Sequence, residues 1–423
     1  MPMTFKLKRI SSLLFLTGIL LIPFYNDVPF VPPFMRSPSR FLFILSLLFF
    51  ILEGLLSNKK WKLFISYQDV IFILVICCFV GLSLIVNLEY SGYIVGDKGN
   101  GIGFMLPAAI SLCSFFIFSL YYKHMLLVIG PPLLCKVVKF SFVLTFTYVL
   151  LEVVFYVLPV RIIDISVMTF LESIFHDRQR VLLMEDMRRV RGFAFEPSYF
   201  VPVLFFMLPF ILNNRSLVLA WCLTVILTFS PTAYLASLAF WFMYKAPKTL
   251  NIMVIFIVSV FICLFLYFIS VEVIVIPWNL LSSSTIRIGS WVSSLSMIYN
   301  NIFFGVGPGM SGYWVHMYYP EFFYSSWEAN NWISLGKNEF SAPTFASILT
   351  LISVIGVLPV FYTVLYMVLK SSKKKVNNNR LGTASIVAML ISSFGVNDYS
   401  FAGFWIFFAI TMSANWYCYD IKK

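Results

Sequence analysis

Apolar segments separated by short polar stretches follow one another along the whole chain of 423 residues. A run of roughly 17–25 apolar residues is long enough for a helix to cross a bilayer. The pattern predicts an all-α, polytopic membrane protein with about twelve transmembrane helices, forming a single transmembrane domain over residues 1–423. The predicted spans are 11–25, 41–56, 69–88, 101–121, 138–159, 198–212, 216–229, 231–244, 250–277, 344–369, 382–396 and 400–418.

Residues 216–244 are the least regular part of this pattern, because Ser230, Pro231 and Thr232 interrupt the apolar run. The stretch is too short for two full spans. The basic residues at its ends, Arg215 and Lys245, would lie on one side of the membrane if it formed a hairpin. We therefore expect two short helices that meet at Pro231, and whether they make one span or two stays open.

The basic residues are divided unequally between the two faces of such a protein. Most of the 30 Lys and Arg fall in short loops on the side of the two termini, and Lys123 is counted among them. Short cytoplasmic loops carry an excess of Lys and Arg, so this face is predicted to be cytoplasmic. The net charge of +12 is spread over these loops instead of forming a patch, which argues against a nucleic-acid partner.

Two outer segments, 160–197 and 278–343, are long enough to fold. In the first, residues 162–175 have apolar positions at helical spacing and predict an amphipathic helix on the membrane surface. Guanidinium groups are always charged and can bind phosphate oxygens bidentately. Phosphate binding and simple pairing with lipid headgroups or acidic neighbours both fit the arginines of this segment, which are Arg161, Arg178, Arg180, Arg188, Arg189 and Arg191.

The order of residues in RRVRGFAFEPSYF (188–200) favours the phosphate interpretation. Gly192 permits unusual backbone torsions and the close approach of a ligand. Pro197 tends to hold Glu196 in an extended conformation and can begin the next helix. A carboxylate near several arginines stays ionised, so Glu196 is expected to orient an arginine or to accept a hydroxyl hydrogen bond.

The second outer segment contains Arg287 at the start of a predicted helix and the turn GVGPG (305–309). This turn lacks the preceding strand and the Lys-Ser/Thr pair of nucleotide-binding loops. No Asp-x-Asp is present in the chain, so we expect no metal ion and no cofactor. The Trp and Tyr side chains of the segment are equally compatible with stacking on sugar rings and with an interfacial belt.

RRVRGFAFEPSYF, followed by RIGSW (287–291) and NNIFFGVGPGMSGYW (300–314), resembles the superfamily of bacterial O-antigen polymerases and O-antigen ligases. The resemblance covers roughly 188–240 and 282–360 in pattern, and the remainder in hydropathy alone. It implies about a dozen spans and two large periplasmic loops with functional arginines, which correspond to Arg191 and Arg287. We predict catalytic roles for Arg191, Glu196 and Arg287, and substrate-binding roles for Arg188, Arg189, Gly192, Gly305 and Gly307.

The resemblance further implies a metal-independent membrane glycosyltransferase that works at the periplasmic face of the bacterial inner membrane. Its donor would be a growing glycan on undecaprenyl diphosphate, and its acceptor a lipid-linked repeat unit. The expected partners are this lipid-linked oligosaccharide, membrane lipids and a polysaccharide chain-length regulator.

One departure from the family separates its two branches. The ligase branch usually carries a His near the end of the second outer loop, where this chain has Glu339, Ser341 and Pro343, and His316 stands too early. This favours O-antigen polymerase, with O-antigen ligase as the alternative. A flippase or transporter is a third possibility, but transporters often carry internal repeats and mid-membrane charges, and here only Glu152 lies well inside a predicted span.

Overall fold

The computed structural model describes residues 3–24, 37–56, 64–92, 101–153, 190, 192, 197–245, 282–325, 347–372, 376–393 and 402–412. Within these ranges every regular element is a helix and no strand occurs, which agrees with the all-α prediction. The predicted amphipathic helix 162–175 and the predicted span 250–277 lie outside the described residues.

Most of the helices coincide with predicted spans, whereas the elements that begin at Leu88, Ser282, Ser311 and Glu321 lie outside them. The first half of the chain forms α1 (Met3–Leu20), α2 (Pro38–Leu56), α3 (Tyr67–Val86), η2 (Leu88–Gly92), α4 (Gly101–Ile129), α5 (Pro131–Glu152), α8 (Pro197–Ile211), α9 (Arg215–Leu227) and α10 (Pro231–Lys245). The second half forms α12 (Ser282–Asn300), α13 (Ser311–Met317), η6 (Glu321–Ser325), α15 (Ser347–Ile355), α16 (Val357–Ser372), α17 (Val376–Ser392) and α18 (Ala402–Met412).

Four of these helices, α2, α3, α4 and α5, are long and apolar enough to cross a membrane. Their exposed surface is rich in Leu, Ile and Phe, as expected for helices that contact lipid. The chain is therefore a helical membrane protein. The total of about twelve spans and the two periplasmic loops stay predictions.

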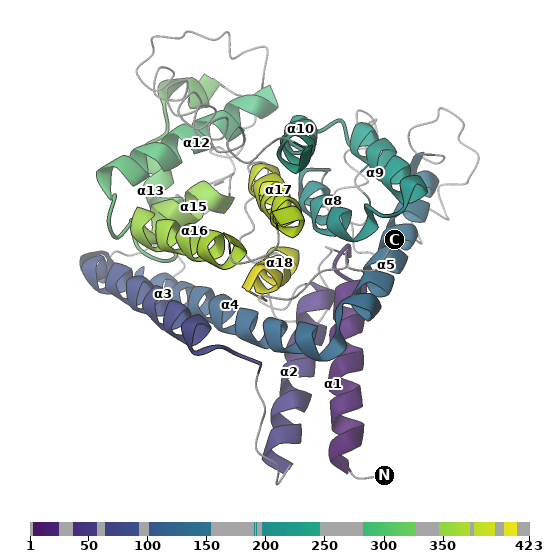
Figure 1. The fold of residues 1–423 in the computed structure, drawn as a ribbon. Helices are drawn as coiled ribbons and strands as arrows, with labels where there is room; N and C mark the ends of the chain where they lie inside the picture. The colour runs from purple at the N-terminus through teal and green to yellow at the C-terminus, as the bar shows by residue number, and fades with distance from the viewer. Residues whose placement is uncertain are drawn as a thin grey trace, which may run out of the picture.

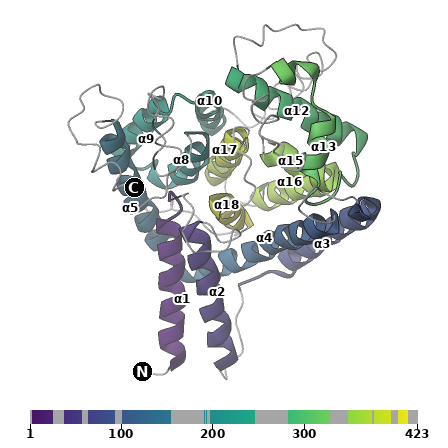
Figure 2. The same ribbon diagram turned by 180° about the vertical axis from the view of Figure 1, so that it is seen from behind.

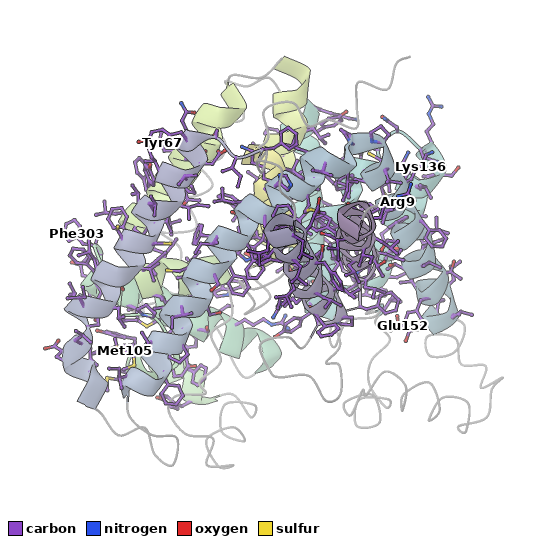
Figure 3. All side chains as sticks on the ribbon, turned by 90° about the horizontal axis from the view of Figure 1, so that it is seen from below. Arg9, Tyr67, Met105, Lys136, Glu152 and Phe303 are labelled. Carbon is purple, nitrogen blue, oxygen red and sulfur yellow. The ribbon has the colours of Figure 1, made fainter. Side chains whose placement is uncertain are left out.

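Helices α3, α4 and α5 form one layer, because α4 packs against both of the others (Figure 1). Tyr67 and Lys136 lie at one end of this layer, and Met105 and Glu152 lie at the opposite end (Figure 3). The charge pattern predicts the Lys136 end to be cytoplasmic and the Glu152 end to be outer. The α1–α2 hairpin runs crosswise to this layer and projects from it (Figures 1 and 2), so the helices do not form one parallel bundle.

Helix α8 occupies the centre of the molecule, in contact with α5, α9, α17 and α18. Every residue from Phe200 to Ile211 is buried, and a helix that is hydrophobic all round belongs in such a position. The indole N–H of Trp221 on α9 donates to the carbonyl oxygen of Leu204 at 2.9 Å, which fastens the two helices together.

The two-helix prediction for residues 216–244 is confirmed. Helix α9 ends at Leu227 and α10 begins at Pro231. Phe229 between them has φ of 46°, and the hydroxyl of Tyr234 donates back to the carbonyl oxygen of Ile226 at 2.9 Å. With 13 and 15 residues, each helix is shorter than the roughly 20 residues of a full span.

The single span predicted at 344–369 is wrong in detail, because Gly356 divides it into α15 and α16. Gly356 has φ of 85°, and a Cβ there would lie 2.1 Å from the carbonyl oxygen of Phe303. The amide of Val357 donates to the carbonyl oxygen of Ile302 at 2.9 Å. The helix breaks because another piece of backbone packs into it, which apolar periodicity does not reveal.

Lys123 was expected in a cytoplasmic loop, but α4 continues to Ile129 and the side chain is only 6% exposed. Its ammonium group donates to the buried carboxylate of Asp69. Tyr366 of α16 donates to the same carboxylate, and Ser66 completes a capping box with Asp69 at the start of α3. This cluster joins α3, α4 and α16, and its ion pair and hydrogen bonds offset the desolvation penalty of burying Lys123.

Breaking this cluster should destabilise the protein. Lys123→Met removes one charge and leaves the carboxylate of Asp69 buried without its cation, a loss of about 3–5 kcal/mol. The measurement is thermal unfolding of the full-length protein in detergent micelles. Lys136→Met is the control, because Lys136 is exposed, and equal losses for the two variants would contradict a stabilising role for the pair.

Candidate functional site

The predicted site residues fall into two groups. Gly192, Arg287, Gly305 and Gly307 are described, whereas Arg188, Arg189, Arg191 and Glu196 lie outside the described residues. The residues on either side of Arg191, Val190 and Gly192, are both described, so the setting of the arginine motif can be built from them.

Gly192 is buried and has φ of 58°, a left-handed conformation that L side chains adopt rarely. Its amide donates to Oε2 of Glu152 at 2.9 Å. A Cβ at this position would lie 2.6 Å from the ring of Phe200 on α8. The backbone conformation and the close packing therefore both require glycine here.

Val190 provides a second attachment two residues earlier. Its side chain is fully buried in the main core, and its amide donates to the carbonyl oxygen of Leu227 at 3.1 Å. Leu227 is the last residue of α9, and Glu152 is the last residue of α5. Both attachments are thus to helix ends, and Val190 and Gly192 are each bound to the bundle.

Glu152 is the carboxylate that sequence reasoning left without a role. It is 4% exposed, and burial of an ionisable group is costly unless it is hydrogen-bonded. The Gly192 amide supplies one hydrogen bond. The sequence could single out Glu152, because it is the one acidic residue in the apolar run 138–159. The sequence could not show that its hydrogen-bond partner is Gly192, 40 residues later.

The second outer segment is fastened to the same end of the layer as Glu152. The Cβ of a side chain at Gly307 would lie 3.2 Å from Cε of Met105, and Met105 lies at that end of α4 (Figure 3). Glu152 and Met105 are far apart across this end (Figure 3). The segment 190–192 and the GVGPG turn therefore share an end but occupy different parts of it.

Gly305 and Gly307 are buried within the GVGPG turn and have positive φ values of 67° and 96°. Their amides donate to the carbonyl oxygens of Asn301 and Val354, at 2.9 and 3.2 Å. The intervening amide of Val306 donates to Ser353 at 2.8 Å. Because backbone acceptors occupy all three amides, the structure gives these glycines a packing role in the turn.

Side chains at the end of α3 hold this turn from the other side. The Ser83 hydroxyl donates to the carbonyl oxygens of Phe304 and Val354. The Asn87 amide donates to the carbonyl oxygen of Gly305 at 3.2 Å. Non-helical backbone inside a membrane protein must be satisfied by the protein itself, and these polar side chains of α3 meet that requirement.

Arg287 lies half-buried on α12, a helix that packs mainly on α13, η6 and α15. Val190 and Gly192, in contrast, make their contacts with α5, α8 and α9. The two parts of the predicted arginine site thus belong to different helix groups, and their convergence stays a prediction.

Several aromatic residues of the second outer segment pack on one another. Tyr319 stacks on Phe323 with ring centroids 3.7 Å apart, and Trp314 stacks on Tyr318. Burial raises the pKa of the Tyr319 hydroxyl above its usual range. These rings form a small core with Met297, Val306 and Val315, so Tyr319 does not offer a face to a sugar or to lipid.

Within the part of the chain that the structure describes, no group of three or more His, Cys, Asp or Glu side chains could hold a metal ion. Comparisons with protein-family models, with curated proteins and with solved structures find no match for this chain.

Glu152 should be necessary for a stable attachment of residues 190–192. Glu152→Ala leaves the buried Gly192 amide without this acceptor, which should cost about 1–3 kcal/mol, whereas Glu152→Gln keeps an acceptor oxygen and should cost less. Thermal unfolding in detergent measures both. The control is Glu89→Ala, at an exposed position of η2, and a loss there as large as that of Glu152→Ala would contradict the prediction.

Proposed function

We propose that this protein is an O-antigen (surface polysaccharide) polymerase, which joins undecaprenyl-diphosphate-linked repeat units at the periplasmic face of the bacterial inner membrane. The observation that carries the proposal is the double attachment of Val190 and Gly192 on the two sides of Arg191. An arginine-rich surface segment that only met lipid headgroups would need no such anchoring, whereas a catalytic group must be held in a defined position.

In the proposed reaction, a hydroxyl oxygen of the acceptor repeat unit attacks the anomeric carbon of the donor glycan. A new glycosidic bond forms at that carbon, and the bond to the diphosphate oxygen breaks. The lipid diphosphate leaves with the bonding electron pair, and the hydroxyl proton passes to a base, for which Glu196 is the candidate. No metal ion takes part in this proposal.

The principal task of the protein is to stabilise the charge that grows on the diphosphate. Arg191 and Arg287, with Arg188 and Arg189, would supply guanidinium groups for this purpose. A fixed donor directed at developing charge contributes roughly 3–4 kcal/mol to lowering the barrier. The half-buried position of Arg287 on α12 fits a fixed donor, because burial restricts the side chain and lowers the local dielectric constant.

A transporter or flippase is the second candidate, and one observation favours it. The break between α15 and α16 at Gly356, filled by the non-helical residues 302–307, is the kind of broken helix that transporters use at their substrate sites. An O-antigen ligase shares the donor of the polymerase and differs in its acceptor.

Deletion of the gene separates these functions in one experiment. Loss of a polymerase should leave a single repeat unit on lipid A–core, whereas loss of a ligase should leave none. Loss of a flippase should leave none on the core and should cause lipid-linked repeats to accumulate on the cytoplasmic side. Gel electrophoresis of lipopolysaccharide, with analysis of the lipid-linked pool, distinguishes the three outcomes.

Bidentate phosphate recognition makes a specific demand on the arginines. Arg191→Lys keeps the positive charge but loses the planar fork, so polymerisation should fall nearly as far as in Arg191→Ala, by about 100-fold or more; the same holds for Arg287. Glycan chain length in complemented deletion cells is the measurement. Arg215→Ala, at an exposed position at the start of α9, is the control. Full activity of Arg191→Lys would rule out bidentate recognition.

A further inference from the structure

Helices α3 and α16 lie antiparallel to each other, starting from the end of the layer that is predicted to be cytoplasmic. The hydroxyl of Tyr366 donates to the carboxylate of Asp69 near the start of α3. One turn further along α3, the ring of Phe72 stacks on that of Tyr362, with centroids 5.3 Å apart. Helix α16 begins at Val357, so the stretch between Val357 and Tyr366 is only about 14 Å long. The core of a bilayer is about 30 Å thick, and α16 therefore accompanies α3 over roughly half of that thickness.

The outer half of α3 has a different neighbour, the non-helical residues 302–305. The amide of Val357 donates to the carbonyl oxygen of Ile302 at 2.9 Å, so these residues lie next to α3 where α16 stops. The Ser83 hydroxyl donates to the carbonyl oxygen of Phe304 at 2.5 Å, and Ser83 lies within the apolar span of α3 and not beyond it. Residues 302–304 are therefore at the depth of a membrane-spanning helix.

Residues 299–303 present large apolar side chains away from the rest of the protein. Tyr299, Ile302 and Phe303 are 78%, 44% and 61% exposed. Phe303 stands at the edge of the α3–α5 layer, between the levels of Tyr67 and Met105 (Figure 3). A contiguous exposed apolar patch is unusual in contact with water, whereas it is the normal surface of a protein in contact with hydrocarbon.

This patch continues the surface of α3 that contacts lipid. Helix α3 is one of the four helices that are long and apolar enough to cross a membrane. The hydrogen bonds from Ser83 and Val357 hold residues 302–304 between α3 and α16, so one apolar surface extends across all three parts. Its exposed side chains on the two helices are Leu82, Ile85, Val86, Leu358 and Phe361.

The polar groups around the patch have partners in the protein, as a hydrocarbon environment demands. The side-chain amides of Asn300 and Asn301 donate to carbonyl oxygens one turn back in α12, at 2.9 and 3.2 Å. The carbonyl oxygen of Gly305 accepts from Asn87, and the backbone from Gly305 to Gly307 is buried. The non-helical backbone thus faces the protein, while the apolar side chains face outwards.

We propose that residues 299–304 form a re-entrant segment, which enters the bilayer beside α3 and binds phospholipid acyl chains through Tyr299, Ile302 and Phe303. The second outer segment is then not a loop that lies wholly outside the membrane. The re-entrant segment attaches it to the hydrocarbon of the leaflet that the charge pattern predicts to be outer. This membrane position does not depend on the proposed function.

Photochemical labelling tests the contact with acyl chains directly. The unaltered full-length protein is placed in lipid nanodiscs of phosphatidylethanolamine and phosphatidylglycerol, with a phospholipid that carries a diazirine in the middle of one acyl chain. After illumination, mass spectrometry of peptides should find lipid adducts within residues 299–303 and within 82–86 of α3, the positive control. None are expected within 321–325 of η6, where Glu321 is exposed. Adducts within 82–86 without adducts within 299–303 would overturn the proposal, as would equal labelling of 299–303 and 321–325.

A charged maleimide measures the exclusion of water from the same segment. The reagent does not enter hydrocarbon, and a thiol there does not ionise to react with it. In nanodiscs, Phe303→Cys should react roughly tenfold or more slowly than Glu321→Cys, and Ile85→Cys should be as slow as Phe303→Cys. Mass spectrometry locates the modified cysteine, so the native cysteines remain. Equal rates for Phe303→Cys and Glu321→Cys would show the segment to be in water and would refute its insertion. If Phe303→Cys does not fold, Ile302→Cys makes the same comparison.

Discussion

The need to satisfy every backbone amide and carbonyl inside an apolar environment determines the irregular parts of this molecule. Helices meet this need internally, so the exceptions are informative. Residues 302–307 leave helical geometry. Their polar groups bond to the side chains of Ser83 and Asn87 and to the buried backbone next to the helix break at Gly356. Gly192 likewise gives its amide to Glu152. In each case a polar group from a distant helix end replaces the hydrogen bond that a helix would have provided, and a glycine provides the space for it. The non-helical segments are therefore integral parts of the packing and not connections added to it.

Two buried carboxylates show how differently the two ends of the molecule use charge. Asp69 is surrounded by donors, including the ammonium group of Lys123 and the hydroxyl of Tyr366, so the cluster joins three helices at the end predicted to be cytoplasmic. Glu152 lies at the other end, and it holds the backbone next to the arginine motif. The first carboxylate therefore stabilises the helix layer, whereas the second fixes the conformation of a segment for which we propose a catalytic role. Asp69, which stabilises the helix layer, and Glu152, which positions residues next to the arginine motif, therefore lie at opposite ends of that layer. The charge pattern predicts these ends to be opposite faces of the membrane.

Hydropathy alone was enough to predict the helical fold and the break at Pro231, because apolar length and proline act locally. It failed where a distant partner decides the outcome. Lys123 ends an apolar run, yet it lies within α4 and can be buried because Asp69 neutralises it. The run 344–369 is divided at Gly356 because Phe303 packs there. For the site, the sequence drew attention to Gly192 and to the turn near Gly307, but it could not reveal that the amides of this turn are occupied.

The separation of the two candidate regions bears on the proposed function. Gly192 and the GVGPG turn belong to different helix groups. Glu152 and Met105, the helix residues that mark them, stand apart across one end of the α3–α5 layer (Figure 3). A transporter that moves a single substrate needs one continuous path with its binding site near the centre. A polymerase must hold two lipid-linked glycans at once, and in the proposed reaction Arg191 and Arg287 act on one diphosphate. The substrate would therefore have to bridge the helix groups of Gly192 and of Arg287.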